Sequence, residues 1–570
     1  MGTTKTVALQ SRGNPVVLDV QSVAAINSGR CVNCGECRDI CPVGAISEQQ
    51  RVICRLCPTC TDKPAMLYDD MEALATKESC TSACPLGISP QGYINLVAAG
   101  REREAFQHIW DRNPLISICG RICHHPCEQA CKRGTLVDEP MSIRGVKRYL
   151  GDAFEGYECE SYPVIYEEEI AVIGAGPAGL MAAHKLALYG YRVTVFEKDP
   201  AAGGMLNNGV PKFRIPRDVI TRDIGRLEKA GITFRFGVNI SPNQIGQLKK
   251  DFDIIIIAAG TPYSKELKIE GWRNEGVYTA LNFMDRVNAD ETIRSHCGQQ
   301  FAEKGDVVVI GGGNVALDCA RTALRLGAKS VTAVCLESGA DVPCHDWERE
   351  EAEEEGVVLL EGWAPKEFKG VLNLLQGVEL EKVAEFTRSE DGVIAFTTNP
   401  SETRSLPADC VIVAIGQAAA GMWKGCESDD AFLFAGDISG ADCSVVDAMA
   451  SGRLAAQKAD EALRGFRRKE GPQGLSCAPV EEKVYLANRL KVARPAMPIV
   501  PADERAANFD EVELDYSKDI IDVEVKRCLK CGYQKIDASL CIGCGVCATV
   551  CPKGDVISMV SYEEGGEENV

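Results

Sequence analysis

Residues 168–198, EEIAVIGAGPAGLMAAHKLALYGYRVTVFEK, decide the fold. A β-branched run leads into Gly174, Gly176 and Gly179, an Ala- and Leu-rich segment follows, and a second β-branched run ends at Glu197. This order predicts a strand, a tight glycine turn, a helix and a second strand, which is a dinucleotide-binding unit. The glycines permit the turn and admit a pyrophosphate at the helix N-terminus, while Glu197 can accept hydrogen bonds from a ribose.

A second copy of this pattern occupies residues 306–338, DVVVIGGGNVALDCARTALRLGAKSVTAVCLES. Gly311, Gly313 and Ala316 take its three small positions. Two such units in one chain predict two nucleotides, FAD in the first and a nicotinamide nucleotide in the second. The predicted fold class is α/β, with two Rossmann-like dinucleotide-binding domains and the NAD domain inserted in the FAD domain.

Three further segments fit the surroundings of these nucleotides. IIIIAAGTP (254–262) and DCVIVAIGQ (409–417) are apolar strands ending near Gly, as expected where the chain crosses between the two domains. In LFAGDISGADCSVVDAMASGRLAA (433–456), Asp437 can bind the flavin ribityl chain, and the next helix N-terminus can face the flavin ring. The expected cofactor-binding residues are Gly174, Gly176, Pro177, Ala178, Gly179, Glu197, Lys198, Gly204, Met205, Leu206, Arg214, Ala259, Gly260, Thr261, Gly311, Gly313, Asn314, Val315, Ala316, Glu337, Gly416, Gln417, Gly436, Asp437, Ser444 and Val445.

The cysteines point to metal. The chain has 28 of them, and a chain of 570 residues does not need disulfides for stability. Two runs, CVNCGECRDICP (31–42) and CIGCGVCATVCP (541–552), have the C-x2-C-x2-C-x3-C-P spacing of bacterial ferredoxins. They predict ferredoxin-like [4Fe–4S] segments near both ends, with the ligands Cys31, Cys34, Cys37 and Cys41, and Cys541, Cys544, Cys547 and Cys551.

For the other cysteine groups, the sequence does not define which cysteines complete each metal site. CRLCPTC (54–60) resembles a second ferredoxin run that lacks its fourth cysteine, with the ligands Cys54, Cys57 and Cys60. Cys41 could complete that cluster, and a more distant cysteine would then complete the N-terminal one. Cys528 and Cys531 form a lone C-x2-C, which fits either a cluster shared with another segment or a zinc site. CGRICHHPCEQAC (119–131) spaces four cysteines evenly and lacks the C-x2-C-H of c-type haem, which argues against haem.

Several motifs resemble a known family. AVIGAGPAGL, GGMLNNGVPKFRIP, VVVIGGGNVALDCARTALRLGA, AIGQ and AGD are similar to the small subunit of glutamate synthase and its relatives. These relatives include the N-terminal half of dihydropyrimidine dehydrogenase and the large subunit of NADH-dependent ferredoxin:NADP oxidoreductase. The resemblance covers about residues 76–465 and includes CTSACPLGISPQGYINLVAAG (80–100) and NPLISICGRICHHPCEQAC (113–131).

The resemblance implies a helical domain with two interleaved [4Fe–4S] clusters before the FAD domain. By position, Cys80 and Cys131 serve one cluster, while Cys84, Cys123 and Cys127 serve the other, and Cys119 is a further candidate ligand. The close cysteine pair that the family places just before these is absent, so Cys54 and Cys57, or Cys57 and Cys60, are candidate substitutes. Lys147 stands where some relatives have a non-cysteine ligand. Four clusters, or five, are expected in all.

The nicotinamide site departs from the family. NADPH-using relatives carry an arginine pair after the second Rossmann strand, where this chain has Leu336 and Glu337. A carboxylate repels a 2′-phosphate and can accept from a free 2′-hydroxyl, so NADH is favoured over NADPH.

Net charge and the distribution of apolar residues limit the possible partners and location of the protein. The net charge of −20 argues against nucleic acid. No apolar run is long enough to span a membrane, and no signal peptide is evident, so a cytoplasmic location is expected. The expected domains are a ferredoxin-like segment (1–70), a helical iron–sulfur domain (71–165), an FAD domain (166–300 and 418–470), an NAD(P) domain (301–417), a linker (471–525) and a second ferredoxin-like segment (526–570).

These features predict an NAD(P)H:iron–sulfur oxidoreductase subunit that exchanges electrons with a ferredoxin or with other redox subunits of a hetero-oligomeric complex. No catalytic side chain is required, because hydride transfer depends on orientation. Flavin-based bifurcation is a variant of this function. The alternative is a non-catalytic iron–sulfur relay or scaffold subunit with a vestigial nucleotide site.

Overall fold

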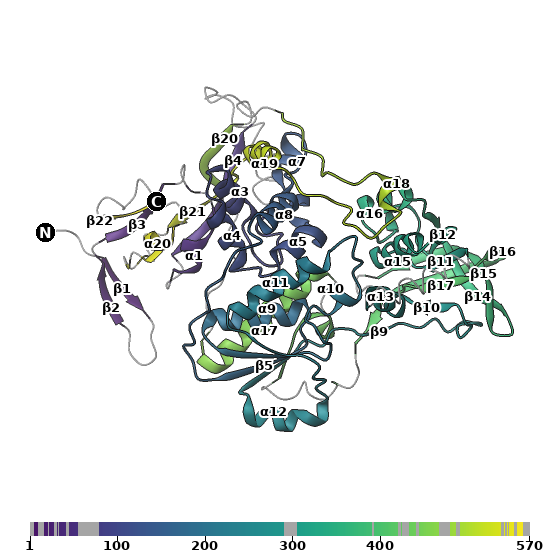
Figure 1. Ribbon diagram of the computed structural model, residues 1–570. Coiled ribbons are helices and arrows are strands. Elements are labelled where there is room, and N and C mark those ends of the chain that lie inside the picture. Colours follow the sequence, from purple (N-terminus) through teal and green to yellow (C-terminus); the bar gives the residue numbers. More distant parts are fainter. Residues whose placement is uncertain are drawn as a thin grey trace.

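The two fingerprint stretches form central strands of two separate parallel sheets. The computed structural model describes residues 5–9, 16–20, 22–27, 31, 33–41, 45–54, 79–289, 305–389, 393–419, 423, 432–440, 444–466, 479–485, 491–536, 541, 544, 546–551 and 556–561. Figure 1 shows both chain ends at one side, the first sheet and a group of helices in the middle, and the second sheet at the opposite side.

The first sheet has the order β19-β8-β5-β6-β7, and its neighbouring strands are parallel. Its strands are β5 (Glu169–Ile173), β6 (Arg192–Phe196), β7 (Thr233–Arg235), β8 (Ile254–Ile257) and β19 (Phe432–Phe434). All four isoleucines of β8 are buried, as expected for a strand covered on both faces. The helices of this domain are α9 (Pro177–Tyr189), α10 (Met205–Asn208), α11 (Arg217–Lys229), α12 (Ile245–Asp251) and α17 (Val445–Arg464).

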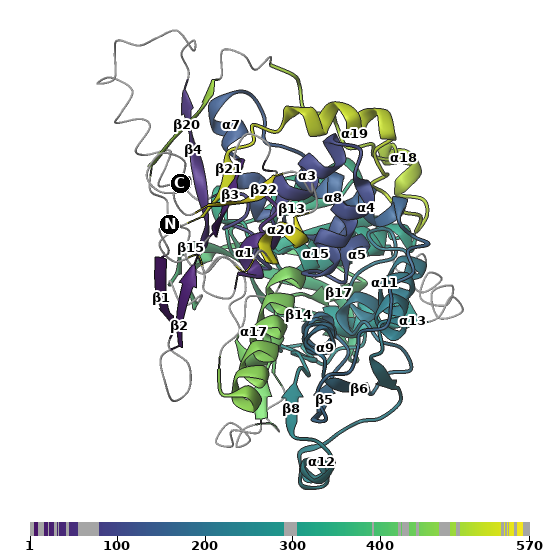
Figure 2. The same cartoon turned by 90° about the vertical axis from the view of Figure 1, so that its left-hand side faces the viewer.

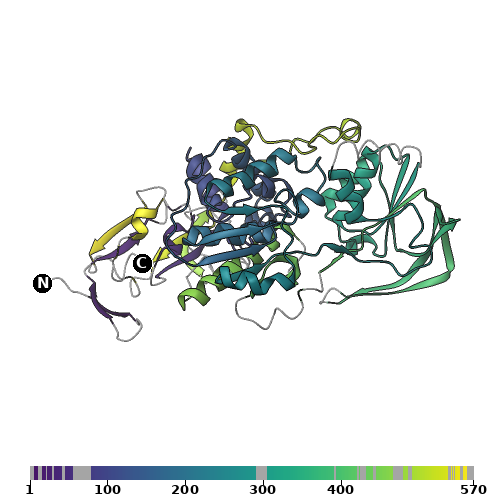
Figure 3. The ribbon, with the colours of Figure 1, turned by 60° about the horizontal axis from the view of Figure 1, so that its bottom comes forward.

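The second sheet has the order β10-β17-β11-β12-β13, again parallel. Its strands are β10 (Val277–Thr279), β11 (Asp306–Ile310), β12 (Ser330–Cys335), β13 (Val358–Glu361) and β17 (Cys410–Val413), with helices α13 (Ala280–Ala289), α15 (Asn314–Arg325) and α16 (Asp346–Glu354). Strand β10, which pairs with β17, lies within residues 166–300, the range that the sequence assigned to the FAD domain. An antiparallel sheet of β14 (Trp363–Val371), β15 (Leu374–Arg388) and β16 (Ile394–Pro407) extends from it (Figure 3). The two-stranded sheet of β9 (Tyr263–Ser264) and β18 (Gln417–Ala418) marks the crossing between the domains.

The helical region, residues 79–154, lies above the first sheet in Figure 1. Its helices are α3 (Pro90–Ala98), α4 (Glu102–Trp110), α5 (Ile116–Ile122), α6 (Pro126–Gln129), α7 (Lys132–Leu136) and α8 (Ile143–Ala153). Helices α5 and α8 approach each other closely at two glycines. A Cβ atom at Gly120 would lie 2.6 Å from the Cα atom of Arg148, and one at Gly151 would lie 2.9 Å from the Cα atom of Ser117. This packing holds Cys119 of α5, and the cysteine loop that follows α5, against α8.

The two ends of the chain form one unit. Strand β3 (Ser22–Ile26) pairs antiparallel with β22 (Ile557–Ser561), and β4 (Ile46–Cys54) pairs with β21 (Gly532–Ile536) and with β20 (Pro479–Tyr485). Helix α1 (Glu36–Asp39) packs against α20 (Val546–Val550), and a separate hairpin joins β1 (Lys5–Leu9) to β2 (Val16–Val20). Figure 2 shows the purple and yellow elements together. We call β3, α1, β4, β21, α20 and β22 the ferredoxin unit.

The segment 491–527, which we call the strap, crosses from the second domain to the helical region (Figure 1). The sequence predicted a linker here, yet the strap contains α18 (Ala502–Arg505) and α19 (Lys518–Glu524) and makes specific ion pairs. Arg121 and Arg144 of the helical region pair with Glu511 and Glu513 at 2.6 Å and 2.7 Å. The strap sequence lacks hydrophobic periodicity because ion pairs, and not an apolar face, hold the strap against the helical region.

Candidate functional site

The first fingerprint is shaped for a pyrophosphate. A Cβ at Gly174, which has φ +105°, would lie 2.4 Å from the Ala258 carbonyl oxygen, and one at Gly179 would lie 1.9 Å from that of Gly174. A Cβ at Gly176 would meet no atom within 4 Å. The first and third glycines are thus needed by the fold, whereas the second leaves open space at the N-terminus of α9, where free amides favour an anion.

Glu197 lies at the end of β6 beside this turn. Its carboxylate is 5% exposed and accepts from the Ala175 amide at 2.8 Å and from the Asp199 amide at 3.0 Å. These bonds fix the carboxylate next to the pyrophosphate space, where a ribose of the dinucleotide is expected. The neighbouring Lys198 side chain pairs with Asp199 at 2.8 Å.

Other predicted FAD residues converge on the same turn. A Cβ at Gly204 would lie 3.2 Å from the Gly176 Cα, and one at Gly436 would lie 2.8 Å from the Ala178 Cβ. Ser444 begins α17 as its N-cap, its hydroxyl accepting from the Asp447 amide at 3.2 Å. Pro177 starts α9, and Met205 and Leu206 start α10, with Leu206 fully buried. The fold therefore brings three separate sequence segments together at this turn.

The two crossing segments meet directly. The Thr261 hydroxyl donates to the Gln417 Oε1 at 3.0 Å, next to Gly260 and Gly416, which have φ +62° and +100°. Burial raises the pKa of Asp437, and a hydrogen bond from Thr261 opposes that shift. Ala259 directly precedes this contact.

The second fingerprint repeats the geometry of the first. A Cβ at Gly311 would lie 2.4 Å from the Ala414 carbonyl oxygen, and one at Gly313 would meet no atom within 4 Å. Ala316 is buried under the turn, Val315 is exposed on it, and the Asn314 side chain accepts from the His345 amide at 3.0 Å.

Glu337 follows β12 and is 6% exposed. Its Oε1 accepts from Arg388 Nη2 at 2.7 Å, and Arg388 is the last residue of β15. Sequence reasoning missed Arg388, because nothing near it in the sequence connects it to the nucleotide turn.

Arg214 has a different environment from the cofactor contact expected of it. Its guanidinium pairs with Asp318 of α15 and with Glu348 of α16, the latter at 3.1 Å. Burial by itself would lower the pKa of Arg214, but Asp318 and Glu348 raise it above its usual value. Arg214 therefore ties the first domain to the second.

Four cysteines of the helical region surround Lys147 on α8. Burial by itself would lower the pKa of Lys147, but the thiols of Cys123, Cys119, Cys127 and Cys84 raise it above its usual value. Burial likewise raises the pKa of Cys119 to about 12, and the Lys147 charge opposes that shift. These four cysteines can hold one [4Fe–4S] cluster beside a buried positive charge. This group adds Cys119 to the three ligands that the family resemblance implied.

Helix α17 connects this cysteine group to the first nucleotide site. The Cys119 Sγ lies 3.7 Å from the Met449 Sδ on α17. Arg453, one turn further along, donates to the carbonyl oxygens of Leu86 and Pro85 at 3.2 Å and 3.3 Å, in the loop that follows Cys84. Sequence reasoning missed both contacts.

The ferredoxin unit mixes cysteines from the two chain ends. Burial, followed by the charges of Glu36, Cys31 and Cys551, raises the pKa of Cys34 to about 12. Burial, followed by the charges of Cys541, Cys544 and Cys41, raises the pKa of Cys547 to about 11. The fourth cysteine of each run thus lies near cysteines of the other run, as in the ligand exchange of two-cluster ferredoxins. Cys551 can therefore serve as the distant cysteine that the sequence required for the N-terminal cluster.

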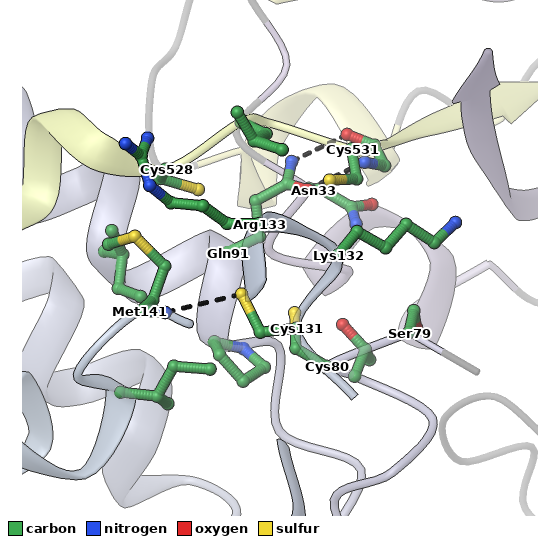
Figure 4. A pocket seen from close by; sticks show the side chains of 16 residues that line it. Asn33, Ser79, Cys80, Gln91, Cys131, Lys132, Arg133, Met141, Cys528 and Cys531 are labelled. Carbon is green, nitrogen blue, oxygen red and sulfur yellow. Dashed lines mark hydrogen bonds between the residues drawn. The ribbon is translucent and has the colours of Figure 1, made fainter. Parts of the chain in front are cut away.

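Four cysteines, Cys80, Cys131, Cys528 and Cys531, line a cavity of about 40 Å³ between the helical region and the ferredoxin unit (Figure 4). Within the described ranges, no three His, Cys, Asp or Glu side chains converge on a single-ion site. Cys54 ends β4, whereas Cys57 and Cys60 lie outside the described residues.

Backbone amides point at sulfur in all four cysteine groups, as is common around thiolate ligands. The amides of Asn33, Ala45, His125 and Met141 donate to the sulfurs of Cys31, Cys41, Cys123 and Cys131 at 3.3, 3.2, 3.4 and 3.5 Å.

None of the helices among the described residues has the length and apolarity that a membrane crossing requires.

Comparison with known proteins gives three family matches. Residues 168–429 match the pyridine nucleotide-disulphide oxidoreductase model, and residues 73–158 match the model of dihydropyrimidine dehydrogenase domain II with its 4Fe-4S cluster. Residues 24–47 and 535–555 match the 4Fe-4S binding domain.

Three curated relatives match this chain over most of its length. The chain is 33% identical to the NADP(+)-dependent formate dehydrogenase subunit beta of Moorella thermoacetica, over 79% of this chain and 70% of that one. It is 34% identical to the NADPH-Fe(3+) oxidoreductase subunit beta of Geobacter sulfurreducens, over 59% of this chain and half of that one. It is 28% identical to the NAD-dependent dihydropyrimidine dehydrogenase subunit PreT of Escherichia coli, over 73% of this chain and 98% of that one.

These matches confirm the resemblance and the fold class inferred from the sequence. The chain is a flavin oxidoreductase that belongs to the family of NAD(P)-dependent redox subunits in which a domain II-type iron–sulfur region precedes a pyridine nucleotide-disulphide oxidoreductase domain.

Proposed function

We propose that this chain is the NADH-oxidising subunit of a larger redox complex and exchanges electrons with a ferredoxin or a partner redox subunit. Bound FAD supplies the conversion between a hydride and single electrons, and four or five [4Fe–4S] clusters supply one-electron carriers. The residues around Gly176 and Glu197 would hold FAD, and those around Gly313 and Glu337 would hold NADH.

The observation that carries this proposal is the placement of α17. Its N-terminus borders the FAD space at Ser444, while Met449 touches Cys119 and Arg453 holds the loop after Cys84. One rigid helix therefore fixes the distance between the flavin site and the nearest cysteine group. Such a fixed short separation is what electron transfer between two bound cofactors requires.

Glu337 supports NADH as the nucleotide. Its carboxylate is buried after β12, where enzymes of this fold distinguish a free ribose 2′-hydroxyl from a 2′-phosphate. Arg388 is engaged with this carboxylate, which matches the positive charge of the guanidinium. A carboxylate held in this way accepts from a hydroxyl and repels a phosphate.

The ferredoxin unit supplies an exit to a partner. It lies at the opposite side of the molecule from the second domain (Figure 3), and Cys544 in it is exposed. Electrons that reach this unit can pass to a protein docked beside Cys544. We expect the complex to work in the cytoplasm, because its clusters need reducing conditions.

Anaerobic titration of the purified chain with NADH and, separately, NADPH tests this proposal. Flavin bleaching is followed optically and cluster reduction by electron paramagnetic resonance. We expect NADH to bleach the flavin at a concentration about tenfold or more below that needed for NADPH, with reduced clusters appearing afterwards. Equal use of NADPH would overturn the nucleotide assignment, and no bleaching by either would favour a relay subunit. Ferredoxin reduction that depends on a second, high-potential acceptor would identify a bifurcating complex.

A further inference from the structure

The four cysteines that line the cavity of Figure 4 come from three stretches that are far apart in the sequence. Cys80 lies in the turn before α3, Cys131 is the N-cap of α7, and Cys528 and Cys531 lie between the strap and β21. In Figure 4, Cys80 and Cys131 are below the cavity, and Cys528 and Cys531 are above it. The cavity volume of about 40 Å³ is several times the roughly 10–15 Å³ that one water molecule needs.

The sulfurs on both sides of the cavity accept hydrogen bonds from nitrogen. The Met141 amide donates to the Cys131 Sγ at 3.5 Å, and the Asn95 side-chain amide donates to the Cys528 Sγ at 3.8 Å. Donors of this kind stabilise thiolates over thiols and are a regular feature around iron–sulfur ligands. Asn95 is itself buried at 3% exposure, so this bond is protected from water.

Buried polar contacts hold the C-terminal pair against α3. Gln91 donates to the Gly532 carbonyl oxygen at 2.6 Å and accepts from the Gly532 amide at 2.7 Å, across 441 residues. Asn95, one turn later, donates to the Gln91 carbonyl oxygen at 2.7 Å and so faces the same side of the helix. Arg133 donates to the Arg527 carbonyl oxygen. Both residues that adjoin the C-x2-C pair are therefore fixed to the helical region.

We propose that Cys80, Cys131, Cys528 and Cys531 hold one [4Fe–4S] cluster, in which the C-terminal pair substitutes for the close cysteine pair missing before Cys80. This inference rests on the proposed function for the role of the cluster, but its ligand set stands on the geometry alone. With it, 16 of the 19 cysteines in residues 31–131 and 528–551 fall into four sets of four, and only Cys54, Cys57 and Cys60 stay outside these sets.

The position of this site gives it a linking role. Asn33, which lies between two ferredoxin-unit cysteines in the sequence, lines the same cavity. On α3, a Cβ at Gly92 would lie 2.7 Å from the Cys34 Cα, so the ferredoxin unit packs directly on this helix. Tyr93, the next residue of α3, is fully buried, and its hydroxyl donates to the carbonyl oxygen of Ile143 at 3.2 Å, on the helix that carries Lys147. The proposed cluster therefore lies between the Lys147 group and the ferredoxin unit.

The test compares two double variants of the full chain, purified anaerobically. We expect Cys528→Ser/Cys531→Ser to lower iron and acid-labile sulfide from about sixteen to about twelve atoms each per chain, as one [4Fe–4S] cluster is lost. The matched control, Cys57→Ser/Cys60→Ser, removes the alternative pair and should leave both counts unchanged. Unchanged iron in the first variant, or loss of about one zinc in place of the four irons, would overturn the proposal.

A second measurement keeps the test decisive if the double variant folds poorly. In the reduced protein, Cys531→Ser and Cys80→Ser should alter the same paramagnetic signal, whereas Cys84→Ser should alter a different one. Alteration of different signals by Cys531→Ser and Cys80→Ser would contradict a shared cluster. Flavin bleaching by NADH is scored separately in the wild type, so failure of the proposed function remains distinguishable from failure of this ligand set.

Discussion

Arg388 Nη2 donates to Glu337 Oε1 at 2.7 Å and thereby connects the end of β15 to the nucleotide turn after β12. Glu337 is nearly buried, whereas the Arg388 side chain is 38% exposed. The arginine thus reaches in from the surface to hold the carboxylate in place. The pair places an arginine close to the position where NADPH-dependent enzymes bind the 2′-phosphate. Here the carboxylate of Glu337 already neutralises the charge of that arginine.

Removing the carboxylate should therefore change the nucleotide preference. In Glu337→Ala, Arg388 loses its partner and becomes available to a 2′-phosphate, a charge-assisted contact of about 1.5–3 kcal/mol. We expect kcat/KM for NADPH relative to NADH to rise by about tenfold or more, measured with a viologen acceptor. The double variant Glu337→Ala/Arg388→Ala is the control and should lose that gain. An unchanged ratio in the single variant would rule out Glu337 as the selective residue.

Gly313 should matter for NADH and not for the fold. A Cβ there meets no protein atom within 4 Å, so Gly313→Ala should fold normally but obstruct the pyrophosphate. We expect normal flavin and iron contents, normal reduction by dithionite, and a KM for NADH raised by about tenfold or more. Gly246→Ala, an equally open glycine in α12, is the matched control and should change nothing. Loss of flavin from Gly313→Ala would show that the second fingerprint does not bind the nicotinamide nucleotide.

Lys147 should raise the reduction potential of the cluster on Cys84, Cys119, Cys123 and Cys127. Its buried charge stabilises the more negative, reduced state, and at an effective dielectric near 20 the interaction is on the order of 2 kcal/mol. Lys147→Met should therefore lower one cluster potential by on the order of 100 mV in a spectroscopic redox titration. Lys147→Arg keeps the charge and should keep the potential. Equal potentials in wild type and Lys147→Met would place the lysine charge away from the cluster.

Glu355 should stabilise the second domain and its contact with the strap. Its buried carboxylate accepts from Arg321 and Arg325 at 2.6 Å and from Arg505 of the strap at 3.0 Å. Glu355→Gln leaves these arginines without their shared counter-charge, which is expected to cost about 3–5 kcal/mol. Faster thermal unfolding, followed by flavin fluorescence, would report the loss. Glu354→Gln, in which an exposed carboxylate is removed, is the control and should cost less than about 1 kcal/mol.

The stability difference between wild type and Glu355→Gln should depend on pH with a definite sign. Burial by itself would raise the pKa of Glu355, but Arg325 and Arg321 lower it to about 2 from an ordinary value of 4.5. A lowered folded-state pKa gives stability that is fully present above about pH 4.5 and lost as the pH falls towards 2. The stability difference between wild type and Glu355→Gln should therefore stay constant from about pH 8 to pH 5. A difference that shrinks steadily across this range would show that Glu355 titrates near neutrality.

Short sequence motifs were sufficient to predict most of the fold. The turns at Gly174 and Gly311 need a positive φ and a missing side chain, and each requirement lies within a few residues of the strand and helix that it joins. The ferredoxin runs are equally local, because three ligands of one cluster come from one loop. The sequence by itself therefore determined the two nucleotide folds, the iron–sulfur chemistry and the family.

Only the tertiary structure decided which groups meet across the chain. A fourth cluster ligand, or a partner for a buried carboxylate, has to be near in space but can lie anywhere in the sequence. Cys551 beside Cys34, Gln91 against Gly532, and Arg388 on Glu337 each join segments that no spacing rule connects. Folding of the two chain ends into one unit, with the strap tied along the helices, brings the first two of these pairs together. The antiparallel sheet that extends from the second domain brings Arg388 to Glu337.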